Sequence, residues 1–389
     1  MRRIHGRPSY LDGSSRTATG TPFPTNSQVP QRPWQNTIHS RPVLIPTFLF
    51  LMVFMISCAD RENQKSALIN GKVLIYTSVP LDTVDSIKKE FEKEKPGIIL
   101  DFFRSGTGEV MKKIDTEAAK GRVEADIVWV ADFSTAEELK EKNLLKKYVS
   151  PEAKNIIPIF IDEEGYYTGS RLLNMVVAYN TKLVKGKPKS YLDLLKPEYN
   201  GKVGIVSPEY SGASIYTVGT MLMSKGFGWE YFYKLHNNQC QIIKNNEIMG
   251  EKIASGELAL GIMLDYIVRG LREEHPGSPI DYVFFEDGIV SIASPVALLR
   301  DCSNLTTAKI FIDWLLSKKG QEFMSREAGI VSVNMNVDVP QGMIPIKQLK
   351  VIPSSAKSIY RNTERIKTIF RDIFAGKAIE KIKVNLEVQ

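Results

Sequence analysis

The sequence predicts an α/β protein built on parallel sheets. Short apolar runs typical of β-strands alternate with segments whose apolar residues recur at helical spacing, which is the pattern of parallel sheets flanked by helices. The 389 residues are 43% hydrophobic and 24% charged, an ordinary globular composition, and this length favours two domains. Only Val43–Ile56 is apolar enough to concern a membrane, so a polytopic membrane protein is excluded.

The alternation begins after residue 71. Lys72–Ser78 is a short apolar β run, and Leu81–Lys95 follows with its apolar residues on one helical face before Pro96-Gly97 ends it. The same reasoning predicts strands at Ile98–Phe103 and Ala125–Ala131, a helix opened by Ser105-Gly106-Thr107-Gly108, and a short helix at Ser134–Lys142.

The second half of the chain continues in the same way and contains no internal repeat. Extended or buried strands are predicted at Gly165–Asn180, Gly201–Val206, Leu258–Leu264, Asp281–Phe285 and Val290–Leu299. Helices are predicted at Ala213–Lys225, Trp229–His236, Asn246–Ser255, Thr306–Ala328 and Ser354–Ala375.

The N-terminal 57 residues indicate an export signal. Residues 1–42 show neither a helical nor a strand period and are expected to be disordered; a start codon assigned too early would also explain them. Arg41 then precedes the apolar run Val43–Ile56, and Met55-Ile56-Ser57-Cys58 resembles a bacterial lipobox whose Cys58 is lipidated. The run has 14 residues, short for a span of about 20, although a single transmembrane anchor is the alternative. Residues 58–70 then form the lipid anchor and polar tether, and the protein is expected in the cell envelope.

Charge and motifs exclude several function classes. The chain carries a formal charge of +7, but residues 1–57 hold six Arg and one Asp, so the rest is nearly neutral and nucleic acid is not an expected partner. No Ser/His/Asp signature, phosphate loop or His-rich metal spacing is present, so an enzyme, a cofactor and a metal site are not expected. Cys240 and Cys302 can form a disulfide or remain free thiols.

The order of several short motifs resembles one family. Its markers are the lipobox, Tyr76-Thr77-Ser78 at the end of the first strand, the helix ending in Glu94-Lys95-Pro96-Gly97, Ala125-Asp-Ile-Val-Trp-Val130, Tyr210-Ser-Gly-Ala213 and Phe311-Ile-Asp-Trp-Leu-Leu-Ser-Lys-Lys-Gly-Gln321. Together they resemble the extracellular solute-binding proteins of ABC importers, in the branch that binds ferric iron, phosphonates or sugar phosphates.

This resemblance implies a two-lobed periplasmic-binding-protein-like fold of type II, with a hinge of crossing strands. Lobe 1 is expected at 71–172 with 296–345, and lobe 2 at 173–295 with 346–389, with the crossings at 174–180 and 290–296. It also implies a monomeric receptor that is held at a membrane through Cys58, captures a small anionic solute and passes it to a permease and ATPase complex. A lipoprotein that keeps the fold for sensing is the alternative.

Hydroxyl and glycine residues after several strands form the predicted ligand site. Free N–H groups and the positive dipole end of a helix attract anions at such places. The residues are Thr77, Ser78, Ser105, Gly106, Thr107, Asp132, Ser211, Gly212 and Ala213, of which the last three match by position a Ser-Gly-Ala turn that contacts an anion in relatives. Helix capping is the alternative role of the Ser, Thr and Asp residues.

Carboxylates in lobe 2 are predicted to bind the organic part of the solute. Asp265 and Tyr266 follow one predicted strand and Glu286 follows another, and carboxylate oxygens accept hydrogen bonds from sugar hydroxyls or an amine; solvated loop charges are the alternative. Iron-binding relatives typically carry adjacent tyrosines near the place of Asp265-Tyr266. Here one tyrosine stands there and Tyr166-Tyr167 lies elsewhere, so a phosphorylated or phosphonate solute is favoured over iron.

Overall fold

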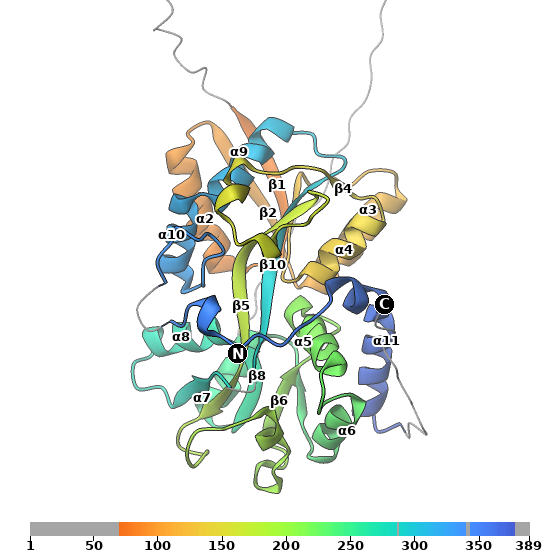
Figure 1. Ribbon diagram of the computed structural model, residues 1–389, viewed down its shortest axis with the longest axis vertical. Helices are drawn as coiled ribbons and strands as arrows, with labels where there is room; N and C mark the ends of the chain where they lie inside the picture. The colour runs from red at the N-terminus through yellow and green to blue at the C-terminus, as the bar shows by residue number, and fades with distance from the viewer. Residues whose placement is uncertain (1–69, 286–287, 340–342, 378–389) are drawn as a thin grey trace, which may run out of the picture. The chain divides into compact units, whose positions relative to one another are not determined.

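The computed structural model describes residues 70–285, 288–339 and 343–377 (Figure 1). The predicted signal, Cys58, the tether and Glu286 lie outside these residues. Within them, no helix is sufficiently long and apolar to cross a membrane. Cys240, which is buried, and Cys302 are both free thiols, so the structure shows the free-thiol alternative and not the disulfide.

The described strands form one sheet in the order β2-β1-β3-β10-β5-β8-β6-β7, with β4 paired to β10 and β9 to β5. One end, β2-β1-β3, is parallel, and so is the other, β8-β6-β7. The strands are β1 (Gly71–Thr77), β2 (Ile98–Arg104), β3 (Ile127–Trp129), β4 (Leu145–Lys146), β5 (Tyr167–Asn180), β6 (Val203–Val206), β7 (Gln241–Ile243), β8 (Leu260–Leu264), β9 (Ile280–Val283) and β10 (Val290–Leu299).

Two long antiparallel strands, β5 and β10, join the two parallel halves. They pair with each other from Val290↔Met175 to Ala297↔Tyr167, while β10 also pairs with β3 and β5 with β8. We call the part around β1, β2 and β3 lobe 1 and the part around β6, β7 and β8 lobe 2; Figure 1 shows β5 and β10 running between them. The predicted two-lobed α/β fold with crossing strands is confirmed, whereas the lobe boundaries by residue number stay a prediction.

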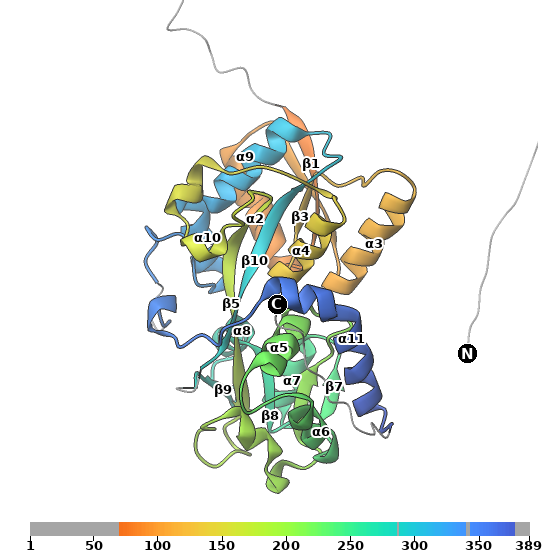
Figure 2. The ribbon, with the colours of Figure 1, turned by 45° about the vertical axis from the view of Figure 1, so that its right-hand side comes forward.

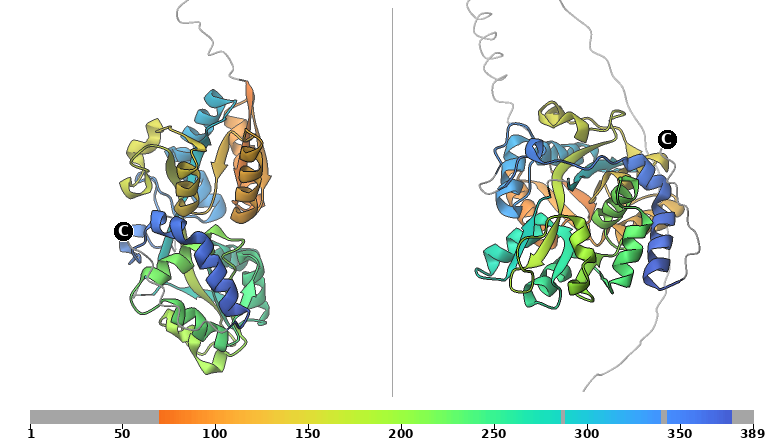
Figure 3. Two further views of the ribbon diagram at one scale, coloured as in Figure 1. Left: turned by 90° about the vertical axis from the view of Figure 1, so that its right-hand side faces the viewer. Right: turned by 60° about the horizontal axis from the view of Figure 1, so that its bottom comes forward.

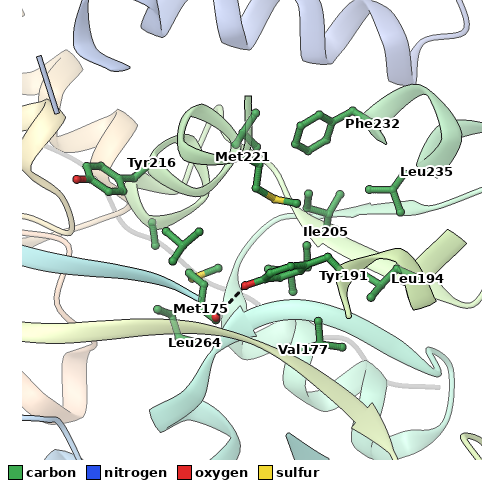
Figure 4. Close-up of a cluster of buried hydrophobic side chains, with 14 of the residues drawn as sticks. Met175, Val177, Tyr191, Leu194, Ile205, Tyr216, Met221, Phe232, Leu235 and Leu264 are labelled. Carbon is green, nitrogen blue, oxygen red and sulfur yellow. Dashed lines mark hydrogen bonds between the residues drawn. The ribbon is translucent and has the colours of Figure 1, made fainter. Parts of the chain in front are cut away.

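Helices cover the sheet because each presents one apolar face to it. In lobe 1 they are α2 (Leu81–Glu94), α3 (Thr107–Ala119), α4 (Phe133–Glu141), α9 (Leu305–Leu316) and α10 (Lys318–Ala328). In lobe 2 they are α5 (Gly212–Met223), α6 (Trp229–Asn237), α7 (Asn246–Ser255) and α8 (Asp265–Glu274). Phe91 of α2 packs edge-on against Phe311 and Trp314 of α9, with ring centroids 5.3 and 5.4 Å away. Figure 4 shows the corresponding apolar core of lobe 2, where Tyr191 lies between β5 and the covering helices.

The predicted helical stretch Thr306–Ala328 is two helices. Ser317 separates α9 from α10 and caps the second one, because its hydroxyl accepts a hydrogen bond from the N–H of Gly320 at 3.1 Å. The sequence reading also missed α8 and the short strands β4 and β7.

The last described helix, α11 (Ala356–Phe374), contacts both lobes. Its buried face packs on α5 and α6, and its N-terminal half reaches α4 of lobe 1 (Figure 2, Figure 3). Ile359 fills the space beside Gly219 of α5, and the Arg361 guanidinium lies 3.9 Å from a carboxylate oxygen of Glu141. The helix therefore spans the two lobes rather than covering lobe 2 alone.

Candidate functional site

A cleft of about 1060 Å³ lies between the lobes, and residues of both lobes line it. Parallel strands bring the predicted turns together here. Thr77 at the end of β1 is paired with Arg104 at the end of β2, so the turns that follow both strands open at one edge of the sheet. In lobe 2, β6 and β8 are parallel neighbours and deliver their following turns in the same way. Eight predicted residues line the cleft: Ser78, Ser105, Gly106, Thr107, Ser211, Gly212, Ala213 and Tyr266.

Two helices begin at the cleft. α3 starts at Thr107 after Gly106, and α5 starts at Gly212 after Ser211. The Ser211 hydroxyl accepts a hydrogen bond from the N–H of Ser214 at 3.2 Å, so it caps α5 while also lining the cleft. The two helix N-termini, one from each lobe, thus contribute a positive potential to a common cavity.

Thr77 and Asp132 are fully buried and do not line the cleft. The Thr77 hydroxyl donates to the carbonyl oxygen of Trp129 at 2.7 Å and ties β1 to β3. Asp132 caps α4, because its carboxylate accepts from the N–H of Thr135 at 3.1 Å, from the Thr135 hydroxyl at 2.9 Å and from the Ser134 hydroxyl. The capping alternative describes Asp132 correctly, and its predicted contact with solute is not supported by this position.

Asp265 is likewise not among the residues that line the cleft. It is 2% exposed, and its carboxylate accepts from the Arg269 guanidinium at 2.8 Å and from the side-chain amide of Asn174 at 3.3 Å. The residue opens helix α8, which places Arg269 one turn later on the same face. The predicted role of Asp265 in binding the organic part of the solute is not supported by this position, because an internal ion pair already uses this carboxylate. Its neighbour Tyr266 lines the cleft instead.

Arg171 is the principal residue that the sequence reading missed. It lies on β5 between the lobes, is 2% exposed and lines the cleft. Its guanidinium stacks over the Trp129 ring at 5.6 Å, and its Nε donates to the Ser294 hydroxyl at 3.3 Å. Its Nη1 has no hydrogen-bond partner among the described residues. The signal in the sequence was a single arginine within the otherwise uncharged run Tyr167–Asn180, all of which is buried.

A second buried donor in the cleft is also unpartnered. The Ser78 hydroxyl oxygen has no hydrogen-bond partner within the described part of the chain, while the Ser78 N–H donates to the carbonyl oxygen of Trp129 at 3.2 Å. Buried polar groups are normally paired, and an unpaired buried charge is especially costly. Ser78 and Arg171 thus each leave one buried polar atom without a hydrogen-bond partner among the described residues, and both residues line the cleft.

Burial affects the acid–base behaviour of this site. It lowers the pKa of Arg171, and the neighbouring Tyr266 acts in the opposite direction. Burial likewise raises the pKa of Tyr266, and Arg171 offsets part of that increase. Tyr266 thus lies in the cleft as a neutral phenol beside a cation, which suits hydrogen bonding to an anion.

Charged residues of both signs surround the mouth of the cleft. Arg104 of lobe 1 lies 3.9 Å from Glu247 of lobe 2, and Arg371 of α11 lies 3.1 Å from Glu209. Among the residues that the structure describes, no group of three or more His, Cys, Asp or Glu side chains is arranged to hold a metal ion.

The fold and the cleft define the class of protein. Two α/β lobes, joined by crossing strands and meeting at a cavity lined with hydrogen-bond donors, are the architecture of a solute receptor that closes on its ligand. Residues 125–354 match the family of bacterial extracellular solute-binding proteins, and the chain belongs to this family. It is therefore a substrate-binding protein of an ABC importer, a transport component without enzymatic activity that delivers solute to a permease and ATPase.

Relatives bind different solutes. The solved periplasmic binding protein AfuA from Actinobacillus pleuropneumoniae, with exogenous fructose-6-phosphate bound, is 25% identical and has a TM-score of 0.73, covering 79% of this chain and 99% of that chain. The Fe(3+)-binding periplasmic protein of Serratia marcescens is 24% identical over 73% of this chain and 86% of its own length. The spermidine/putrescine-binding periplasmic protein 1 of Haemophilus influenzae is 24% identical over 74% and 84%. All three relatives are named as periplasmic binding proteins.

Proposed function

We propose that this receptor captures a small phosphorylated or phosphonate solute for import. The observation that carries the proposal is that two residues lining one cleft, Arg171 and Ser78, each have a buried unpartnered donor, Nη1 and Oγ. An oxyanion with several acceptor oxygens can pair with a guanidinium and hydroxyls at once. The predicted residues Ser105, Thr107 and Ser211–Ala213 then complete the anion site from both lobes.

The lining of the cleft supports this assignment because both lobes contribute donors. A solute that contacts Ser78 and Arg171 on one side and the start of α5 on the other stabilises the state in which the lobes meet. Tyr266 is then the lobe 2 residue best placed to contact the ligand next to Arg171. The name of the fructose-6-phosphate-bound relative agrees with this chemistry.

Ferric iron is the second candidate. Tyr266 lies in the cleft, and a relative is named as a ferric-binding protein. Binding Fe³⁺ through Tyr266 requires a phenolate, but burial raises the pKa of this residue. The Arg171 cation opposes a bare metal ion as well. Iron binding would produce a visible phenolate-to-iron band, which separates this candidate from the first.

We also propose that lipidation of Cys58 holds the receptor at the membrane. The support is the lipobox-like sequence Met55-Ile56-Ser57-Cys58 and the polar residues that follow it. Diacylation adds two acyl chains, which suffices for stable anchoring. Mass spectrometry of the purified chain tests this: a lipid-bearing peptide that begins at Cys58 is expected, and an unprocessed peptide that continues from Ser57 contradicts it.

A thermal-shift panel tests the ligand proposal. It contains fructose-6-phosphate, glucose-6-phosphate, 2-aminoethylphosphonate, inorganic phosphate, spermidine and ferric citrate. A ligand present at a hundredfold excess over its dissociation constant stabilises the native state by about 2.7 kcal/mol. We expect the midpoint to rise with an organic phosphate or phosphonate. A rise with spermidine or ferric citrate alone contradicts the proposal.

A further inference from the structure

Three glycines lie where the two lobes touch. Gly106 and Gly108 belong to the start of α3 in lobe 1, and Gly212 is the first residue of α5 in lobe 2. Figure 1 and Figure 2 show α3 and α4 on one side of this contact and α5 on the other. The contact is made by backbone rather than by long side chains, so its geometry leaves little room for substitution.

The available space can be measured by adding a methyl group to each glycine. A methyl group at Gly106 would lie 2.7 Å from the carbonyl oxygen of Tyr210, and one at Gly108 would lie 2.6 Å from the carbonyl oxygen of Glu209. One at Gly212 would meet Thr107 at 2.7 Å and also the carboxylate of Asp132. Both carbonyl oxygens belong to the lobe 2 backbone, which cannot move aside as the end of a flexible side chain can.

Backbone conformation does not explain these glycines. Gly106 has φ −62°, which any residue adopts, and Gly108 is not among the glycines with positive φ. Gly108 also lies within a helix, where glycine is less favourable than alanine. Since glycine is locally unfavourable there, close approach of the other lobe is the feature that it accommodates.

Gly108 is separated from the main cleft. Gly106 and Gly212 line that cleft, but Gly108 lines a different cavity of about 300 Å³ beyond the lobe contact, between α3, α4, α5 and α11. A change at Gly108 therefore alters the contact between the lobes without adding atoms to the main cleft.

We propose that Gly108 is a positioning residue for lobe closure, which sets ligand affinity by admitting the Glu209 backbone and not by touching the solute. The proposal rests on the two-lobed receptor function and not on the identity of the solute. In the closed state the helix start of lobe 1 seats against Glu209–Gly212, and a side chain at position 108 props the lobes apart. Closing on a ligand then carries an added cost, and the bound state is reached less often.

Gly108→Ala tests this inference, with Gly270→Ala as its matched control. Gly270 also lies inside a helix, α8, and an added methyl group there meets no atom within 4 Å. Both substitutions replace glycine by alanine in a helix, so the change in residue type is the same and only the contact with the other lobe differs. Two readouts are measured on the full chain: the affinity for fructose-6-phosphate and the hydrogen–deuterium exchange of peptides covering Glu209–Gly212.

We expect Gly108→Ala to weaken fructose-6-phosphate binding at least tenfold and to speed exchange in Glu209–Gly212, while Gly270→Ala matches the wild type in both. Equal exchange and equal affinity in the two variants overturn the proposal. If the wild type does not bind the sugar phosphate, the proposed ligand is wrong, but the exchange comparison still decides the role of Gly108. Faster exchange in Gly108→Ala then supports it, and exchange equal to that of Gly270→Ala overturns it.

Discussion

Two arginines, the buried Arg171 of β5 and the partly buried Arg269 of α8, have different surroundings. Arg269 pairs with Asp265 at 2.8 Å and also donates to the carbonyl oxygen of Gly329. Each arginine has one unpartnered nitrogen, Nη1 of Arg171 and Nε of Arg269, but Arg171 has no carboxylate partner among the described residues. Burial acts to lower the pKa of both, but Asp265 outweighs burial at Arg269, whose pKa is raised, whereas the pKa of Arg171 is lowered.

The comparison distinguishes an arginine that stabilises the fold from one whose charge is available to a ligand. An arginine whose charge is balanced internally holds elements together, and here it joins α8 to the segment that contains Gly329. An arginine that is buried without a counter-charge costs folding free energy, which a binding protein recovers only when its ligand arrives. Substitution of Arg269 should therefore lower the free energy of unfolding and change ligand affinity little. Substitution of Arg171 should lower ligand affinity without lowering the free energy of unfolding.

The largest effect is expected from Arg269→Met. Removing the guanidinium leaves the Asp265 carboxylate buried without its cation, which should lower the free energy of unfolding by about 3 kcal/mol. Ligand affinity should change little. Denaturant unfolding measures the loss, and Arg272→Met is the control, because Arg272 lies on the same helix with its side chain 51% exposed. Equal losses in the two variants would show that the Asp265–Arg269 pair is not a structural one.

Arg171→Met should give the reverse result. Loss of a charge-assisted contact to an anionic ligand costs about 2–3 kcal/mol, a factor on the order of 100 in the dissociation constant. The unfolding free energy of the ligand-free protein should rise by about 1 kcal/mol, since a buried charge without a partner is removed. Calorimetry and denaturant unfolding provide the two numbers. A variant that is both less stable and unchanged in affinity would make Arg171 another structural residue.

Ser78→Ala should have a smaller effect of the same kind. The hydroxyl has no partner among the described residues, so its removal should not destabilise the fold, while one hydrogen bond to the ligand is lost at a cost of about 1 kcal/mol. Thr77→Val is the matched control, because the Thr77 hydroxyl is bonded to Trp129 and lies outside the cleft. That control should lower stability and leave affinity unchanged.

The smallest effect is a pH dependence from Asp132. Burial raises the pKa of its carboxyl above the ordinary value, although the hydrogen bonds from Ser134 and Thr135 act to lower it. The Asp132 charge in turn contributes to the raised pKa of Tyr216. The folded state then binds the Asp132 proton more tightly than the unfolded state does. The contribution of Asp132 to the free energy of unfolding therefore grows as the pH falls through its raised pKa, and it is complete below the ordinary pKa of aspartate.

Asp132→Asn removes that titration. The melting temperature of the wild type minus that of the variant, measured from pH 8 to pH 4, should therefore increase as the pH falls. Taking the difference removes the contribution of other carboxylates, such as Asp101, Glu117 and Asp193, whose pKa is lowered and which therefore act in the opposite direction. A constant or decreasing difference would contradict the raised pKa of Asp132.

Much of the fold was predictable because it depends on local periodicity. The alternation of strands and helices and the long β5 and β10 segments are visible in the sequence, and parallel strands place the turns at Ser78 and Ser105 at one edge. Thr306–Ala328 was read as one helical stretch because its apolar face continues across Ser317. The break became visible only where the Ser317 side chain caps a new helix.

The site was harder to predict because it depends on pairing in three dimensions. The sequence shows that Asp265 follows a strand, but it does not show that helix α8 begins there. Only within a helix does the four-residue spacing bring Asp265 and Arg269 onto the same face. Arg171 was visible as one charge within a buried run, yet only the packed structure shows that no carboxylate in the described part of the chain pairs with it. Local patterns thus found the hydroxyl turns, and tertiary packing decided which charged groups face the ligand.

The most direct test of the account is a calorimetric titration of fructose-6-phosphate and of fructose into the wild type and Arg171→Met. The account predicts that the wild type binds the phosphorylated sugar and not fructose, and that Arg171→Met loses about two orders of magnitude in affinity for the phosphorylated sugar. Equal binding of fructose and its phosphate, or undiminished binding by the variant, would contradict the claim that Arg171 anchors an anionic solute.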